Sequence, residues 1–327
     1  MSFETHRIFD IQTEQDFNEL ALALFRHQSK ENAVYRSYLR AIGRDAFVPG
    51  SPEDIPFLPI SFFKTMVVQT GDWQPVMQFT SSATTSGKVS RHPVLHPDLY
   101  EKSFLEGFSR LYGHPKEFAL LGLLPSYLER PDASLVYMVD HLMKSSGNEW
   151  GGFFLDNQLE LHRRLEELKE KGQKTMLIGV TFALLDMSSN HPMHFPGLMV
   201  VETGGMKGRG EELTREEVHQ RLAAGFGVQH IHSEYGMTEL FSQAWSRGQG
   251  RFQCPPWMKV QTRELRDPLA RAGLGVTGGL NIMDLANCDS CAFIATDDLG
   301  RVHSDGTFEV LGRFDQSEIR GCNLMVV

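Results

Sequence analysis

Short apolar runs alternate with amphipathic helical stretches through the middle of the chain, and this alternation constrains the fold more than any other feature. The runs 118–124, 175–178 and 198–201 are nearly continuous in apolar residues, which is typical of strands buried on both faces of a sheet. The stretches 135–143 and 159–171 lie between the first two runs and carry apolar residues at helical spacing. Helices that connect successive strands place those strands parallel, so the sequence predicts an α/β fold with helices on a mostly parallel sheet.

The two ends of the chain differ in texture from this middle part. Residues 14–28 show the apolar spacing of a helix, and short β-like runs separated by Gly and Asp begin near residue 259. We therefore expect three parts, namely an N-terminal helical cover over 1–55, an α/β core over 56–258 and a small β-rich subdomain over 259–327.

Local signals predict where some elements begin. The capping box Thr-Arg-Glu-Glu at 214–217 predicts that a helix starts there. Pro97 opens another helix close behind a hydroxyl-rich stretch, which we expect to lie at the helix N-terminus or just before it. Residues 62–69 are expected to be extended.

The composition limits the possible partners. The chain of 327 residues has 32 Lys and Arg against 41 Asp and Glu, a formal net charge of −9, which argues against nucleic acid or an anionic membrane as the main partner. Its longest apolar run, 176–185, is shorter than the ~20 residues needed to span a bilayer. Because the chain has four cysteines and no signal-peptide pattern, we expect a cytoplasmic protein with free thiols.

The densest run of small hydroxylated residues is TSSATTSGKVSRH at 80–92. Hydroxyls and backbone N–H groups around flexible Gly87 can bind an anion, and Lys88 with Arg91 adds positive charge. The run predicts a phosphate-binding loop, with a solvated surface loop as the structural alternative. It is not a Walker A loop, because Ser82 stands where that motif needs Gly.

Two further loops follow apolar runs, and open α/β sheets bind ligands at the carboxyl ends of their strands. In ETGGMKG at 202–208, Gly204 and Gly205 leave bare backbone against which a flat ligand can lie. A tight turn has the same composition, so either interpretation fits this loop.

The second of these loops is SEYGMTE at 233–239. Tyr235 offers a ring for stacking and Thr238 offers a hydroxyl group. Glu239 supplies a carboxylate, which is a ligand that Mg²⁺ prefers. Each of these residues alone also fits a purely structural role.

These motifs occur in a fixed order in a known superfamily. The order resembles that of the adenylate-forming enzymes, which include acyl- and aryl-CoA ligases, adenylation domains and luciferases. The matching motifs are the loop 81–90, Tyr-Gly-x-Thr-Glu at 235–239, Thr-Asp-Asp-Leu-Gly-Arg at 296–301 and Gly-Arg-Phe-Asp at 312–315. Within the superfamily the chain most resembles the LuxE-type acyl-protein synthetases and their phenylacetate-CoA-ligase-like relatives. The cues for this subgroup are 56–64, 124–130 and 255–257.

The resemblance implies that ATP and Mg²⁺ are used to activate a carboxylic acid, which is a fatty acid in the LuxE-type subgroup, and that the acyl group then passes to a thiol. It assigns the ATP phosphates to Ser81, Ser82, Thr84, Thr85, Gly87 and Lys88. It assigns the adenine to Gly204, Gly205, Tyr235 and Gly236, and the ribose to Asp298 and Arg313. Thr238 would contact the α-phosphate, Glu239 would bind Mg²⁺, and Asp315 would lie at the hinge of the family. Lys88, Thr238, Glu239 and an acceptor cysteine, Cys322, are the implied catalytic residues.

The chain departs from the superfamily pattern at two places. Ala83 replaces the first Gly of the usual Ser-Gly-Thr-Thr-Gly loop. The sequence ends at Val327, about where larger members begin a mobile C-terminal domain with a lysine essential for adenylation. We therefore expect that this domain is absent, as in LuxE-type proteins. Those proteins carry an acyl-accepting cysteine near the C-terminus, and Cys322 matches it, although a small buried hydrophobe is the structural alternative.

Two other functions stay open from the sequence. An acyl- or aryl-CoA ligase would use CoA as acceptor and leave Cys322 without a catalytic role. A non-catalytic module would bind nucleotide or acyl groups and dock to a partner enzyme. For the acyl-protein synthetase, the expected recipient is a partner reductase or an acyl-acceptor protein.

Overall fold

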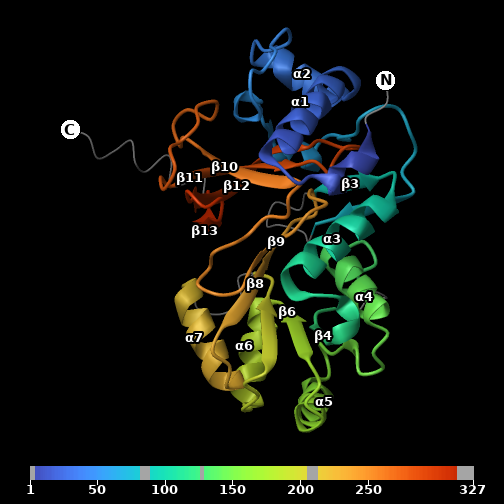
Figure 1. The fold of residues 1–327 in the computed structure, drawn as a ribbon, viewed down its shortest axis with the longest axis vertical. Coiled ribbons are helices and arrows are strands. Elements are labelled where there is room, and N and C mark those ends of the chain that lie inside the picture. The colour runs from blue at the N-terminus through green and yellow to red at the C-terminus, as the bar shows by residue number, and fades with distance from the viewer. Residues whose placement is uncertain (1–3, 82–88, 126–128, 205–212, 315–327) are drawn as a thin grey trace, which may run out of the picture. The chain divides into compact units, whose positions relative to one another are not determined.

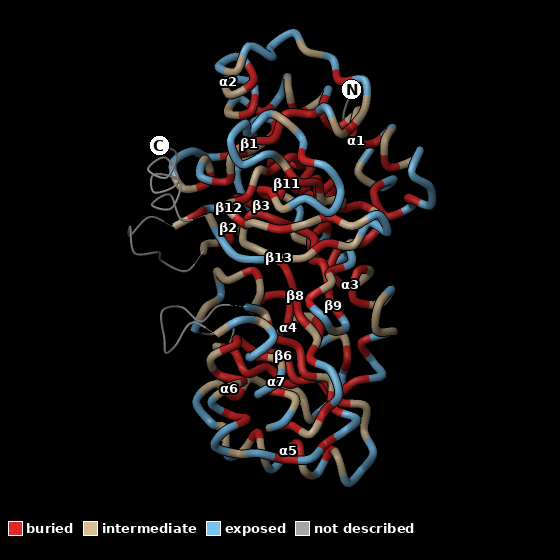
Figure 2. The backbone as a smooth tube through the Cα atoms, turned by 90° about the vertical axis from the view of Figure 1, so that its left-hand side faces the viewer, coloured by how far each residue is buried: buried red, intermediate tan, exposed pale blue. Residues whose placement is uncertain are grey.

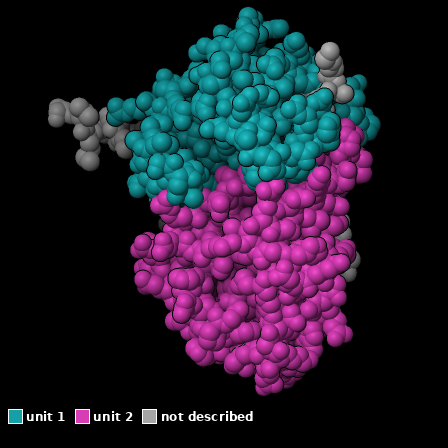
Figure 3. All heavy atoms as spheres, in the orientation of Figure 1, with its two compact units in different colours: residues 1–74, 256–327 teal, residues 75–255 magenta. Residues whose placement is uncertain are grey.

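The computed structural model describes residues 4–81, 89–125, 129–204 and 213–314 (Figure 1). By internal contacts the chain forms two compact units, one of Met1–Gln74 with Pro256–Val327 and one of Pro75–Pro255 (Figure 3). We call them unit 1 and unit 2. This grouping into two units does not test the three-part division expected from the sequence, which stays a prediction. Of the described helices, none combines the length and hydrophobicity that a bilayer crossing requires.

Unit 2 is built on a mostly parallel sheet, as predicted. Among the described residues the sheet has six strands in the order β5-β4-β6-β7-β8-β9, and only β9 runs antiparallel to its neighbour. The strands are β4 (Ala119–Leu123), β5 (Gly152–Phe153), β6 (Thr175–Gly179), β7 (Leu198–Glu202), β8 (Ile231–Tyr235) and β9 (Ala244–Ser246). Every residue of β4 and β6 is buried, and Figure 2 shows the buried path of β6 and β8 in red. This burial on both faces explains the nearly continuous apolar runs.

Helices connect these strands in the way the apolar spacing predicts. They are α3 (Pro97–Tyr112), α4 (Ser134–Ser146), α5 (Gln158–Glu170), α6 (Thr181–Asn190) and α7 (Arg215–Phe226). Helix α4 packs against α3 and β4, and α7 packs against α6 and β8 (Figure 1). The predicted capping box is present. The Thr214 hydroxyl oxygen accepts a hydrogen bond from the Glu217 N–H, and the Glu217 carboxylate accepts one from the Thr214 N–H.

A β-hairpin of unit 2 was not predicted. Strands β2 (Met77–Thr80) and β3 (Arg91–Val94) pair antiparallel, and residues 82–88 between them lie outside the described residues. Strand β3 therefore lies between residues 82–88 and α3, whose N-terminus the sequence predicts to lie at the loop or just behind it. Pro93 hides this strand from sequence reasoning, because proline cannot donate to a ladder and occurs mainly on edge strands.

Unit 1 places helices α1 (Glu14–Glu31) and α2 (Ala33–Ala41) beside a five-stranded sheet of the described residues. The strands are β1 (Leu58–Pro59), β10 (Met258–Arg263), β11 (Gly278–Asp284), β12 (Phe293–Val302) and β13 (Phe308–Arg313). Neighbouring strands are antiparallel except β1 and β12. Short 3₁₀ helices are η1 (Thr5–Asp10), η2 (Pro52–Asp54) and η3 (Ile60–Lys64) in unit 1 and η4 (Pro115–Glu117) in unit 2. The extended conformation expected for 62–69 is thus wrong over its first residues.

One buried side chain ties α1 to the loop between β11 and β12. Gln28 is completely buried, and its amide nitrogen donates to the carbonyls of Asn287 and Cys288, both at 3.0 Å. Its amide oxygen accepts from the Ala292 N–H at 2.9 Å. The buried backbone groups of this loop thereby find hydrogen-bond partners on a helix that is more than 250 residues away in the sequence.

We expect Gln28→Ala to lower the free energy of unfolding by roughly 2–4 kcal/mol, because it leaves buried carbonyls and an N–H without partners. Gln15→Ala is the matched control, since Gln15 lies on the same helix and its amide bonds only an exposed carboxylate, that of Glu19. The control should stay within about 0.5 kcal/mol of the wild type. Urea unfolding of both variants measures this, and equal midpoints would contradict the structural role of Gln28.

Candidate active site

The residues expected at an ATP site fall into three groups. Unit 2 contains Ser81, Gly204, Tyr235, Gly236, Thr238 and Glu239. Unit 1 contains Asp298 and Arg313. The remaining ones lie outside the described residues, namely Ser82, Thr84, Thr85, Gly87, Lys88, Gly205, Asp315 and Cys322.

The two ends of the hydroxyl-rich loop are held together. The Ser81 N–H donates to the Ser90 carbonyl at 3.1 Å, and the Ser90 N–H donates to Ser81 Oγ at 2.9 Å. Next to them, the Thr80 hydroxyl donates to the carboxylate of Asp132, and the Thr80 N–H donates to the Asp132 carbonyl at 2.8 Å. The Thr80 hydroxyl holds the pKa of that carboxyl below its usual value. The loop therefore starts and ends on a fixed base.

His92 joins the hairpin to the motif that follows β8. Its ring is completely buried, and Nδ1 lies 2.8 Å from the carbonyl oxygen of Thr238. Burial lowers the pKa of His92 to about 4, so the ring is neutral at pH 7. Since a carbonyl can only accept, Nδ1 carries the proton and donates it. The hydrogen bond thus fixes the backbone of Thr238 relative to β3.

The Tyr-Gly-x-Thr-Glu motif begins at the end of β8. Tyr235 is the last residue of that strand, is buried, and packs against Phe252 with ring centroids 5.8 Å apart. A Cβ at Gly236 would collide with the carboxyl group of Glu234, so another residue here would require that side chain to move. Glu239 closes the motif with a buried carboxylate.

A buried carboxylate also shapes the Gly204 turn after β7. Glu202 accepts the Gly204 N–H at 2.8 Å and the Thr181 hydroxyl at 3.0 Å. Burial raises the pKa of Glu202, but hydrogen bonds from His219 and Ser233, among other contacts, outweigh it and bring the pKa to about 2. Gly204 has a φ of +74°, in the left-handed region that favours glycine. The ionised carboxylate therefore stabilises a turn that another residue would strain.

A cavity of about 180 Å³ opens at the carboxyl ends of the parallel strands. Leu124 follows β4, Val180 follows β6, Thr203 follows β7 and Gly236 follows β8, and all four line it. Thr238 lines it as well. A ligand pocket at this edge is what the α/β sheet predicts.

Sequence reasoning missed the most unusual acid of this cavity. Glu234 lines the cavity and its side chain is buried. Burial, with a smaller effect of the Glu202 charge, raises the pKa of Glu234 to about 8. The carboxyl group is therefore protonated at pH 7 and can donate a hydrogen bond. Glu234 directly precedes Tyr235 in the motif, so its position was visible, but its burial was not.

Unit 1 brings together the two residues expected at the ribose. Asp298 on β12 and Arg313 on β13 are partners in the antiparallel register. Arg313 Nε donates to Asp298 Oδ1 at 3.1 Å, and the Asp298 N–H bonds Thr296 Oγ1 at 3.2 Å. The carboxylate is nearly buried while the guanidinium is largely exposed.

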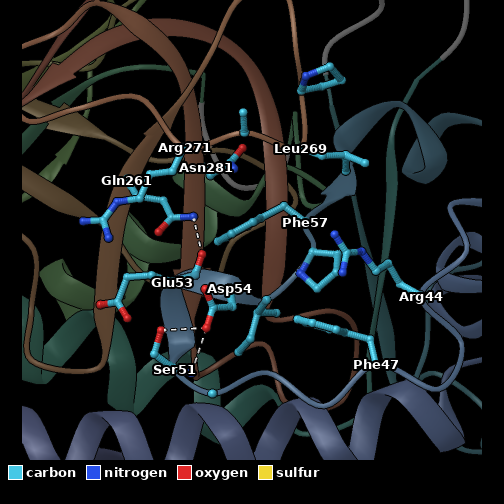
Figure 4. Close-up of a pocket in the computed structure, with 15 residues that line it drawn as sticks. Arg44, Phe47, Ser51, Glu53, Asp54, Phe57, Gln261, Leu269, Arg271 and Asn281 are labelled. Carbon is cyan, nitrogen blue, oxygen red and sulfur yellow. Dashed lines mark hydrogen bonds between the residues drawn. The ribbon is translucent and has the colours of Figure 1, made fainter.

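Unit 1 also contains a larger cavity, of about 600 Å³, between the segment 44–57 and the strands β10 and β11 (Figure 4). Gln261 donates to the Glu53 carbonyl at 3.4 Å there, and Ser51 bonds the Asp54 carboxylate at 3.1 Å. None of the residues expected at the ATP site lines this cavity.

Comparisons with known proteins agree with the geometry. No protein-family model matches the chain. The long-chain-fatty-acid–luciferin-component ligase of Vibrio harveyi is 24% identical over 335 residues, which cover 94% of this chain and 86% of that protein. Among solved structures, 2-hydroxyisobutyryl-CoA ligase in complex with 2-HIB-AMP and CoA matches with a TM-score of 0.67 and 12% identity, over 94% of this chain and 72% of that one.

The chain is thus similar to adenylate-forming ligases in sequence and in fold. Its likeness to a fatty-acid ligase over most of both lengths agrees with the resemblance to LuxE-type acyl-protein synthetases. ATP-bound MatB from Rhodopseudomonas palustris shares the fold with a TM-score of 0.54 and 16% identity, over 72% of this chain and 47% of MatB. The chain thus spans about half the length of MatB. The predicted α/β fold is confirmed, and the comparisons agree with the predicted family and ligase class.

The structure unites part of the site that the resemblance predicts. Within unit 2, the base of the hydroxyl-rich loop and the Tyr235–Glu239 motif are connected through His92, and the motif borders the cavity. Within unit 1, Asp298 and Arg313 are paired. The roles of the individual residues stay predictions.

We expect Glu234→Gln to stabilise the protein by an amount that grows with pH. The folded wild type keeps the Glu234 proton until about pH 8, whereas the unfolded chain releases it near the ordinary pKa of 4.5. Wild-type stability therefore falls through this window by about 1.4 kcal/mol per pH unit from this group, and glutamine removes that loss. Urea unfolding from pH 5 to 9 measures the difference between variant and wild type.

Glu216→Gln is the charge-matched control, because it removes an exposed carboxyl group on α7. A Glu234→Gln stability difference that does not change with pH, or that changes equally for Glu216→Gln, would contradict a protonated Glu234.

Proposed function

We propose that the protein activates an aliphatic carboxylic acid with ATP and transfers the acyl group from the resulting acyl adenylate to a thiol. The observation that carries this proposal is the cavity bordered by Gly236 and Thr238 at the carboxyl ends of the parallel strands. The cavity receives the acid, and the motif beside it receives the nucleotide. The relationship to a ligase of a long-chain fatty acid supports this division.

The first half-reaction needs positioning more than covalent chemistry. A carboxylate oxygen of the acid attacks the α-phosphorus of ATP in line, the bond to the bridging oxygen breaks, and pyrophosphate leaves with the electron pair. Thr238 faces this point from the cavity wall, and His92 holds its backbone. A fixed hydroxyl group costs no reorganisation as charge develops on the phosphorus oxygens.

The hydroxyl-rich loop is assigned to the departing phosphates. We propose that Ser82, Thr84, Thr85 and Lys88 bind them, with Gly87 giving the backbone its freedom. The support is the fixed base made by Ser81, Ser90 and the Thr80–Asp132 pair. Lys88 carries the positive charge that the Ser/Thr side chains lack.

Glu239 is the proposed ligand of Mg²⁺. Proteins bind Mg²⁺ through one or two carboxylates, with phosphate oxygens and water completing the octahedron. Glu239 fits this pattern as a buried carboxylate in the motif, and no cluster of three metal-binding side chains occurs among the described residues. When bound, Mg²⁺ neutralises charge on the phosphates and so favours pyrophosphate departure.

The nucleoside is the remaining part of ATP to be assigned. Tyr235 and Gly236, with Gly204 and Gly205, are proposed for the adenine. Asp298 is proposed for the ribose hydroxyl groups, since a carboxylate accepts hydrogen bonds from both. Its pairing with Arg313 orients the carboxylate for that task.

The second half-reaction transfers the acyl group to sulfur. A thiolate attacks the acyl carbonyl, a thioester forms, and AMP leaves with the electrons of the broken C–O bond. We propose Cys322 as this thiol, with a partner reductase or an acyl-acceptor protein as the next recipient. CoA as the acceptor is the competing assignment.

We expect Glu239→Gln to reduce acid-dependent exchange of pyrophosphate into ATP at least 100-fold and to raise the Mg²⁺ concentration needed for half-maximal exchange. The amide keeps the size of the side chain but loses the charge that holds the ion. Glu216→Gln serves again as control and should exchange like the wild type. Full exchange by Glu239→Gln at wild-type Mg²⁺ would place the metal elsewhere.

We expect Cys322→Ala to abolish acylation of the protein while leaving pyrophosphate exchange intact, because exchange precedes thiol attack. Intact-mass analysis after incubation with ATP, Mg²⁺ and acid detects the added acyl group, and hydroxylamine should remove it. Cys254→Ala is the control, since it removes a half-buried cysteine of the described chain. Acylation that persists in Cys322→Ala, or release of acyl-CoA by both proteins, would favour another acceptor.

A further inference from the structure

Arg130 is the one positively charged side chain among the described residues that line the cavity of unit 2. It lies in a turn between β4 and α4, where the Ala133 N–H donates to the Arg130 carbonyl at 3.1 Å. Its side chain is 35% exposed, so the guanidinium group is accessible to a ligand. Both substrates of the proposed reaction are anions, and a cation at the wall of this cavity is placed to bind one of them.

A carboxylate outside the cavity holds the guanidinium group by one edge. Arg130 Nε donates to Asp132 Oδ1 at 3.3 Å, and Asp132 is not one of the described residues that line the cavity. Within the described part of the chain, the terminal NH2 groups of Arg130 make no hydrogen bond. These groups form a planar fork, which matches paired oxygen atoms of a phosphate or a carboxylate. The ion pair therefore orients Arg130 and leaves its fork for a ligand.

The same carboxylate is attached to the base of the hydroxyl-rich loop. The Thr80 hydroxyl donates to the Asp132 carboxylate, and the Thr80 N–H donates to the Asp132 carbonyl at 2.8 Å. Thr80 lines the cavity and directly precedes Ser81, from which the loop proposed for the phosphates continues. Arg130 is thus connected through one residue to the phosphate side of the site.

The turn that carries Arg130 is fixed at its far end as well. The Tyr100 hydroxyl of α3 donates to the carbonyl of Ser134, the first residue of α4, at 3.0 Å. Strand β2 therefore holds the turn at Asp132, and helix α3 holds it at Ser134. A side chain on a fixed turn loses less conformational freedom when it binds a ligand.

No ionised carboxylate among the described lining residues competes for the guanidinium group. Glu234 is the one acidic residue among them, and burial raises its pKa to about 8, so it is uncharged at pH 7. Thr238, which is proposed for the α-phosphate, lines the same cavity as Arg130. The charge of Arg130 therefore lies in the cavity in which the two substrates are proposed to meet.

We propose, on the basis of the function proposed above, that Arg130 is a catalytic residue of adenylation and that its terminal NH2 groups bind the α-phosphate of ATP. A carboxylate oxygen bonds to the α-phosphorus, and pyrophosphate leaves with the electron pair of the broken P–O bond. The guanidinium group reduces the repulsion between the two anions and stabilises charge on the non-bridging oxygens. The adenylate keeps a negative charge on this phosphate, so the contact persists in the intermediate.

Pyrophosphate exchange with dodecanoate and hexadecanoate tests the catalytic role. Arg130→Met should lower kcat about 100-fold, because it removes a charged donor from the reacting phosphate. The KM for the acid should stay near the wild-type value, since the substitution leaves the binding of the acid untouched. Arg130→Lys should recover part of the lost rate, because lysine keeps the charge but lacks the fork.

Calorimetric titration with AMP and with adenosine separates a phosphate contact from an effect on folding. Arg130→Met should bind AMP about 10-fold more weakly than the wild type, because a hydrogen bond to a charged group is lost. It should bind adenosine as the wild type does, since adenosine has no phosphate. Unchanged binding of adenosine also shows that the variant is folded.

Arg164→Met is the matched control. Arg164 also belongs to unit 2, its side chain is 30% exposed, and its Nε donates to Glu160 at 3.1 Å, but it does not line the cavity. Its substitution also removes a hydrogen bond to the Trp150 carbonyl at 3.2 Å, so its effect on folding should be at least as large. The control should exchange pyrophosphate and bind AMP like the wild type. If both arginine variants lose exchange equally, the effect acts through the fold and the proposal is wrong.

The outcomes distinguish the role of Arg130 from the function beneath it. A raised KM for the acid with unchanged AMP binding would place Arg130 at the substrate carboxylate and overturn the contact with the α-phosphate. A wild-type kcat in Arg130→Met would overturn it too, and adenylation by the wild type would stand in both cases. A wild type that neither exchanges pyrophosphate with these acids nor binds AMP would overturn the proposed function, and the role of Arg130 with it.

Discussion

The hydrogen bond from His92 to the Thr238 carbonyl is the contact on which the candidate site of unit 2 depends. It joins two segments that are 146 residues apart in the sequence, the hairpin that carries the hydroxyl-rich loop and the motif that follows β8. Because the ring is completely buried, it is held neutral and the bond does not switch near neutral pH. A charged side chain at this place would be buried without a counterion, which costs free energy. A neutral imidazole fixes the backbone without that cost.

Two buried glutamates at the same edge of the sheet illustrate how surroundings decide charge. Glu202 on β7 has several donors around it and stays ionised, while Glu234 on β8 has burial and a neighbouring negative charge and stays protonated. The ionised one stabilises the Gly204 turn through its backbone N–H. The protonated one faces the cavity as a donor. Glutamates on adjacent strands are thus in opposite protonation states. The charge on Glu202 favours the protonated form of Glu234, because two neighbouring carboxylates would repel each other.

Much of the fold followed from the sequence because it rests on local patterns. Continuous apolar runs gave the parallel strands, since burial on both faces leaves no polar positions, and the capping box at Thr214 gave the start of α7. The β2–β3 hairpin did not follow, because Pro93 weakens the strand pattern and the pairing joins segments across a loop. Motif order located Tyr235, Thr238 and Glu239. The role of His92 could not be read in this way, since it depends on burial and on a contact made only in the folded chain.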